Sequence, residues 1–130
     1  MASNKCKDEG FTAFANMLRV NETLIEVSFS QNVISNDGVT NLARMLPYNA
    51  TLNHLDLSRN LFNDSGFEDF ARLMAENTGL KFLDIAKNKD VTDEGSLITL
   101  VDSLSVNERL RTLDLSGLTV RKPFLKQVFD

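Results

Sequence analysis

A nine-residue phrase recurs along this chain, and its spacing restricts the fold more than any other feature. Leu24, Leu52, Leu80 and Leu110 each begin a segment that reads L-x-x-L-x-L, at steps of 28, 28 and 30 residues. An asparagine occupies the ninth position in the first three copies, and Leu118 replaces it in the fourth. Repetition at this period is typical of a solenoid, in which stacked units bury a shared core.

The first part of each repeat has the pattern of a short β-strand. In the first copy Val27 and Phe29 lie two residues apart, which is the spacing of side chains on one face of a strand. We therefore expect a strand over residues 24–29, ended by Asn32. An asparagine amide can bond the backbone groups that lose their partners where a strand turns.

The second part of each repeat has the pattern of an amphipathic helix. Polar residues such as those at 35–37 supply capping groups, and apolar residues then recur at i, i+3, i+4 and i+7. An asparagine closes each helix, and we expect it in the left-handed backbone conformation that this residue tolerates. The helix-closing asparagines are Asn21, Asn49, Asn77 and Asn107.

A unit of 28 to 30 residues has room for a strand and a full helix, as in the long class of leucine-rich repeat. The phrases LNHLDLSRN at residues 52–60 and NDSGFEDFARLMAENTGL at residues 63–80 resemble the ribonuclease-inhibitor-like leucine-rich-repeat proteins. That group includes NLR receptors, RanGAP, tropomodulin and leiomodin, and the actin-regulatory CARMIL proteins. The resemblance implies an α/β solenoid, a right-handed βα superhelix with a parallel sheet on its concave side and helices on its convex side.

The register predicts one domain over residues 1–130 with partial repeats at both ends. The predicted units are a loop and helix at 4–23, full repeats at 24–51, 52–79 and 80–109, and a partial repeat at 110–130. Neither end carries the polar cap of a complete solenoid, so we expect a segment of a longer array or ends covered by a partner. Self-association through exposed ends is an alternative, and residues 123–129 could form an improvised cap.

Composition argues against several classes of function. The formal net charge of −4 indicates no basic surface for nucleic acid, and no apolar stretch approaches the roughly 20 residues of a membrane span. Cys6 is the single cysteine, so an internal disulfide cannot form, and the cytoplasm is the expected compartment. We expect no cofactor and no metal. Cys6 aligns with an apolar loop column, which favours burial.

The strand positions between the leucines are expected to face a partner from the concave side. The candidate residues are Glu26, His54, Asp56, Arg59, Phe82, Asp84, Lys87, Arg111 and Asp114. Asp56, Asp84 and Asp114 would form a row about 4.8 Å apart, where like charges repel by roughly 1 kcal/mol in water. A basic partner side chain would relieve this repulsion. Alternatively, the row is neutralised by Arg59, Lys81, Lys87 and Arg111.

Two further interpretations concern the same face. Phe82 is either an exposed interface residue or is packed against His54 and Thr112. His54, Asp56 and Ser58 are the residue types of a catalytic triad. However, residues two apart on a strand have Cα atoms about 6.6 Å apart, and no nucleophile elbow accompanies them. A metal site from His54, Asp56 and Asp84 has little support from one histidine.

We therefore expect a non-catalytic module that binds a protein through its concave face. The cytoskeletal resemblance implies actin or an actin-regulatory protein as the partner. Two alternatives remain, namely a structural spacer within a larger solenoid and a RanGAP-like regulator of a GTPase.

Overall fold

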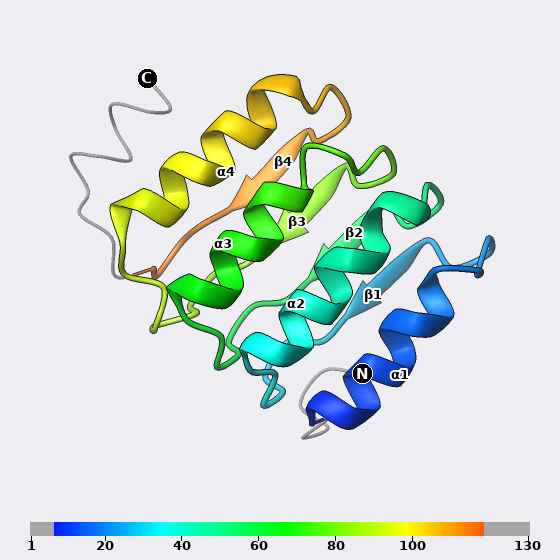
Figure 1. Cartoon of the computed structure of the whole chain (residues 1–130), viewed down its shortest axis with the longest axis horizontal. Helices are drawn as coiled ribbons and strands as arrows, with labels where there is room; N and C mark the ends of the chain where they lie inside the picture. The colour runs from blue at the N-terminus through cyan, green and yellow to red at the C-terminus, as the bar shows by residue number, and fades with distance from the viewer. Residues whose placement is uncertain (1–6, 119–130) are drawn as a thin grey trace.

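A computed structural model describes residues 7–118 as two layers, a sheet and a row of helices (Figure 1). The helices are Asp8–Leu18 (α1), Asn36–Met45 (α2), Asp64–Leu73 (α3) and Glu94–Val106 (α4), and the 3-10 helix Leu46–Tyr48 (η1) follows α2. The strands are Glu26–Ser28 (β1), His54–Asp56 (β2), Phe82–Asp84 (β3) and Thr112–Asp114 (β4). Strand and helix alternate along the described chain, so the predicted α/β solenoid is confirmed.

The strands form one parallel sheet in the order β1-β2-β3-β4, and the register follows the repeat. His54 pairs with Glu26 on one side and with Phe82 on the other. The strands are shorter than predicted, but backbone hydrogen bonds continue beyond them. The N–H of Phe29 donates to the carbonyl of Asp56 (2.8 Å), and that of Gln31 donates to Ser58 (3.1 Å). Equivalent positions of successive repeats are therefore neighbours in space.

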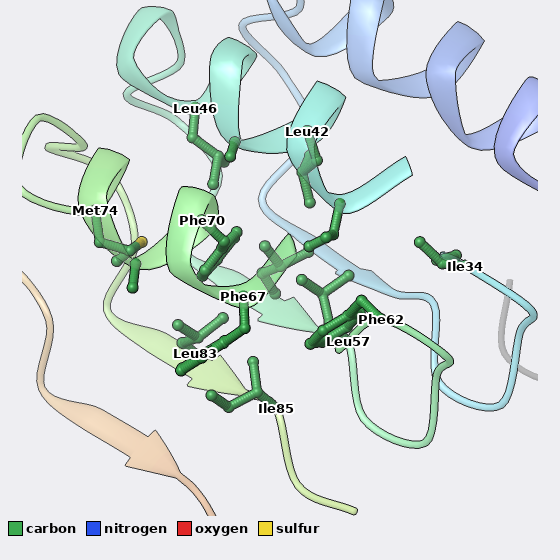
Figure 2. Close-up of a cluster of buried hydrophobic side chains, with 14 of the residues drawn as sticks. Ile34, Leu42, Leu46, Leu57, Phe62, Phe67, Phe70, Met74, Leu83 and Ile85 are labelled. Carbon is green, nitrogen blue, oxygen red and sulfur yellow. The ribbon is translucent and has the colours of Figure 1, made fainter. Parts of the chain in front are cut away.

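The core lies between the two layers (Figure 2). Leu55 and Leu83 of the sheet are fully buried, as are Phe67 and Phe70 of α3. The predicted helix stripes supply most of the helix side of this core, which confirms their period. Burial of one such side chain stabilises the fold by about 1.5 to 3 kcal/mol, and no single repeat could bury its stripe alone.

The strand-ending asparagines bond the backbone where the strands turn, as predicted, and they also join successive repeats. Nδ2 of Asn60 donates to the carbonyls of Phe29 and Leu57, both at 3.0 Å. Oδ1 of Asn60 accepts from the N–H of Ile34 (3.2 Å), and Asn60 in turn donates its own N–H to Oδ1 of Asn88 (2.8 Å). The buried amides thus satisfy the backbone where the strands turn.

The helix-closing asparagines do not adopt the left-handed conformation, so that prediction was wrong. Asn49 has φ of −114° and Asn107 has φ of −86°. Their side chains connect repeats instead. Nδ2 of Asn49 donates to the carbonyls of Leu18 (2.8 Å) and Asn21 (3.0 Å), while its Oδ1 accepts from the N–H of Leu52 (2.9 Å). Asparagine is used here for its two-sided amide rather than for its backbone freedom.

The helix starts are also capped between repeats. Ser35, at the start of α2, donates its N–H to Asp8 of the preceding repeat (2.9 Å). Asp64 accepts from the N–H groups of Thr92 and Asp93, both at 2.9 Å, and from Oγ of Ser96 (3.0 Å). Partial burial opposes ionisation of Asp64, but these hydrogen bonds outweigh it and lower its pKa. The predicted capping residues are therefore present, but most of their bonds run between repeats.

The expectations for Cys6 and for residues 123–129 lie outside the described residues. Among residues 7–118, none of the helices has the length and apolar character needed to cross a membrane.

Candidate functional site: the exposed face of the sheet

The side chains at the first and third positions of each strand form the sheet face, which points away from the helices. They alternate with buried residues such as Leu55 and Leu83, as the pleat of a strand requires. Because the register equals the repeat, the sheet face consists of rows. One row is Glu26, His54, Phe82 and Thr112, and the next is Ser28, Asp56, Asp84 and Asp114.

In each aspartate of the second row, one carboxylate oxygen has a structural role. Oδ1 of Asp84 accepts the backbone N–H two residues ahead, from Ala86 (2.8 Å). The same contact recurs at Asp56 (2.9 Å) and at Asp114 (2.9 Å). These bonds stabilise the turn that follows the strand, as aspartate commonly does. The recurrence of aspartate in this row is thus partly explained by the fold.

The second carboxylate oxygens differ along the row. Oδ2 of Asp56 accepts a hydrogen bond from Oγ of Ser28 (2.8 Å). Among the described residues, Oδ2 of Asp84 accepts none. Asp84 therefore lies between two other aspartates, and its Oδ2 has no hydrogen bond within residues 7–118.

The charges of the row are incompletely neutralised. Burial raises the pKa of Asp84, the negative charges of Asp56 and Asp114 raise it further, and the hydrogen bond from Ala86 and the nearby His54 oppose the rise. The pKa of Asp114 is lowered, mainly by hydrogen bonds from Ser116 and to a smaller extent by Lys87.

Neutralisation of the row by flanking cations, the alternative considered from sequence, is seen at one position, where Lys87 lowers the pKa of Asp114. Within residues 7–118, none of Arg59, Lys81, Lys87 and Arg111 forms an ion pair with the three aspartates. They are held beyond the two ends of the strands.

An aromatic pair lies beside the aspartates. The rings of His54 and Phe82 are stacked, with centroids 4.1 Å apart and planes 20° apart. Both residues are half-buried, while Glu26 and Thr112 at the ends of this row are exposed. The packing of Phe82 against His54 is therefore observed, and the pair still presents part of its surface on the sheet face.

Arg59 and Lys87 lie just past the carboxyl ends of the strands. Their backbones are left-handed, with φ of 57° and 59°, and their exposed side chains help to line a cavity of about 430 Å³. Gly117 holds the equivalent position of the next repeat at φ of 70°. Cγ of Lys87 lies 2.8 Å from where a Cβ of Gly117 would be, so a side chain there would displace Lys87. Arg111 lies exposed at the opposite, amino end of its strand.

The geometry does not assemble the triad or metal arrangement considered from sequence. The hydroxyl of Ser58 pairs with that of Ser30 (2.8 Å), while the ring of His54 stacks on Phe82. Among the described residues, no group of three or more His, Cys, Asp or Glu side chains is placed to hold a metal ion. The sheet face offers charge, hydrogen-bond acceptors and an aromatic surface, which is the chemistry of recognition.

Comparison with known proteins agrees with the repeat and the fold. The profile described as Leucine Rich repeat matches residues 20–43, 48–71 and 76–95, which together cover slightly more than half of the chain. The chain belongs to the leucine-rich repeat family. A search of curated proteins finds no match to it.

Among solved structures, this leucine-rich repeat chain is similar to "Leiomodin-1 Actin-Binding Site 2 (ABS2)". The TM-score is 0.84 at 17% sequence identity, and the match covers 98% of this chain and 75% of that one. At this identity the likeness shows a shared fold. The leucine-rich-repeat solenoid expected from the resemblance is thereby confirmed.

The leucine-rich repeat pattern predicted the exposed positions of the strands, but one feature of the helix ends was missed. Tyr48 is 65% exposed at the position just before a helix-closing asparagine. The equivalent positions of other repeats hold Val20 and Val106, also well exposed. An apolar column outside the helix stripe was the signal in the sequence that could have marked this edge.

Proposed function

We propose that this chain is a non-catalytic module that binds a partner protein through its sheet face, and that the partner is actin or an actin-regulatory protein. Asp84 is the observation that carries the proposal. It is half-buried, it lies between two other aspartates, and one of its oxygens has no hydrogen bond within the described residues. A partner that supplied a cation would relieve the repulsion by which Asp56 and Asp114 raise the pKa of Asp84.

An arginine or lysine of the partner fits this place best. A guanidinium could bond two neighbouring carboxylates and lie against the exposed part of the His54 and Phe82 pair. Family membership supports a recognition role, because repeat solenoids present extended binding surfaces. The similar leiomodin structure is titled as an actin-binding site, which makes actin the first partner to test. The proposal includes the cytoplasm as the compartment, because that is where a protein would meet actin.

The test removes charge while keeping the turn. The variant Asp56→Asn, Asp84→Asn, Asp114→Asn retains an oxygen at each position to accept the backbone N–H two residues ahead. A matched control removes three exposed acidic charges elsewhere, as Asp37→Asn, Asp102→Asn, Glu108→Gln. Binding is measured by co-sedimentation with filamentous actin and by fluorescence anisotropy with monomeric actin.

We expect the sheet-face variant to bind at least about tenfold more weakly, equivalent to about 1.4 kcal/mol, and the control to bind like the native chain. Equal binding by all three proteins would move the site away from the sheet face. If the native chain binds neither form of actin, the actin assignment fails. Affinity capture from a cytosolic extract with the same three proteins then tests the sheet face alone, and no difference among the captures would favour a spacer.

A further inference from the structure

A second surface lies along the edge where the helices end. The helices run in the same direction, so the carboxyl ends of α1, α2 and α3 lie side by side along one edge of the molecule (Figure 1). A cleft of about 570 Å³ opens there. We call it the helix-end cleft, and its lining comes from the last turns of α2 and α3, from η1, and from the residues that follow α1 and α3. None of its lining residues belongs to the sheet face.

An exposed tyrosine forms part of this cleft. The short helix η1 carries Pro47 and ends at Tyr48, which is 65% exposed. The guanidinium carbon of Arg19 lies 5.1 Å from the centre of the Tyr48 ring, within the range of a cation–π contact. Among the described residues, no other aromatic side chain is as exposed as Tyr48. Tyrosine and arginine are the residue types most enriched where interfaces gain their affinity.

The apolar character of this edge recurs with the repeat. At the position before the helix-closing asparagine, Val20 is 78% exposed, Tyr48 is 65% exposed and Val106 is 64% exposed. Glu76 holds this position in the remaining repeat. Single exposed apolar residues are ordinary, but a repeated column forms a line along one edge, and the interior stripe does not require it.

The charges of the cleft are opposite in sign to the chain as a whole. Arg19 and Arg44 line it together with one carboxylate, Glu76, whereas the chain has a formal net charge of −4. Within residues 7–118, neither arginine forms an ion pair. Arg72 on the surface of α3 differs, because it contacts Glu68 (3.3 Å) and Asp69 (3.4 Å).

We propose that the helix-end cleft binds an acidic segment of a partner protein that also carries an aliphatic side chain. The carboxylates would meet the guanidinium groups of Arg19 and Arg44, which favour bidentate contact with carboxylate. The aliphatic side chain would pack between Tyr48 and the apolar lining supplied by Met45 and Leu73. This site is independent of the sheet face, where the proposed contact has the opposite charge.

The test uses a random dodecapeptide library displayed on phage. The native chain is the target, and the library is first depleted on the folded variant Arg19→Glu, Arg44→Glu. We expect the retained peptides to combine carboxylates with leucine, isoleucine or valine. A synthetic copy of one retained peptide, titrated into ¹⁵N-labelled native chain, should shift the amides of residues 17–20, 44–48 and 73–76.

Three variants locate the binding. Tyr48→Ala and the Arg19→Glu, Arg44→Glu variant should each weaken the peptide at least about tenfold. The control Lys81→Glu, Arg111→Glu reverses two exposed cations beside the sheet and should leave the affinity unchanged. Circular dichroism checks that each variant is folded. Retained peptides without carboxylates, shifts confined to other residues, or no peptide that depends on the two arginines would overturn the proposal. Self-association of the native chain that shifts the same amides would assign the cleft to a second copy and overturn it equally.

Discussion

Two lines of polar side chains cross the repeats next to each other, and they differ in how fully the protein satisfies them. Asn60 and Asn88 form the inner line, where the amides are buried and bonded on both sides. Asp56 and Asp84 belong to the outer line on the sheet face, where the carboxylates repel one another and one oxygen of Asp84 has no hydrogen bond to the described part of the chain. Both lines repeat at 28 residues. The period therefore shows which positions correspond, and the hydrogen bonds show which positions stabilise the fold.

The largest effect is expected from a break in the inner line. Asn60→Leu removes the acceptor of the Ile34 N–H, which has no other partner within residues 7–118, and it removes donors to Phe29 and Leu57. The carbonyls of Phe29 and Leu57 keep one bond each, from Asn32 and Asn88. The buried N–H left without an acceptor and the lost hydrogen bonds should together lower the free energy of unfolding by about 3 kcal/mol, as measured by urea denaturation.

Asn53→Leu is the matched control for this change. Asn53 is half-buried, and its side-chain amide has no hydrogen bond within the described residues, so the substitution should cost less than about 1 kcal/mol. If the two substitutions cost the same, the inner line contributes no more than any polar position, and the comparison between the lines fails.

A smaller change in the free energy of unfolding, of opposite sign, is expected at Arg59, which lies between the inner and outer lines. Arg59 has φ of 57°, a conformation that costs a side-chain-bearing residue about 1 kcal/mol or more. Arg59→Gly should therefore raise the free energy of unfolding by up to about 1 kcal/mol, after the added flexibility of glycine in the unfolded chain. Arg72→Gly, inside α3, should lower it by about 1 kcal/mol. Thermal unfolding of both variants tests the contrast.

An Arg59→Gly variant that is less stable than the native chain would mean that the arginine side chain stabilises the fold. A stabilised variant would show that arginine is kept at a strained position in spite of its cost. Such a trade is typical of residues that serve binding.

The repeat made the fold predictable, because strands, helix stripes and register all follow from one period and from which side chains are apolar. The same period did not reveal which residues have a left-handed backbone, since Arg59 and Lys87 are neither glycine nor asparagine, the residue types that usually mark it. It left open whether Phe82 packs on His54 or is exposed, and it did not reveal the exposure of Tyr48. These features depend on contacts between neighbouring repeats and on backbone strain. A pattern of residue types within one repeat contains neither.

The smallest effect concerns the outer line and its dependence on pH. The pKa of Asp84 is raised in the folded chain, so its charge destabilises the fold at neutral pH. Asp84→Asn keeps the acceptor for Ala86 and removes that charge. It should be slightly more stable than the native chain at pH 7, and the gap should close as the pH falls below the ordinary carboxyl value of about 4. Solvent screening keeps the gap small.

Asp64→Asn should change the stability at pH 7 in the opposite direction. The pKa of Asp64 is lowered, so its charge stabilises the fold above the ordinary carboxyl pKa, and this contribution is lost as the pH falls through the lowered pKa. The variant should be less stable than the native chain at pH 7 and approach it in acid, as followed by urea denaturation across pH. If Asp84→Asn also destabilises at pH 7, the chain neutralises its own aspartate row. The sheet face then loses its reason to bind a cation.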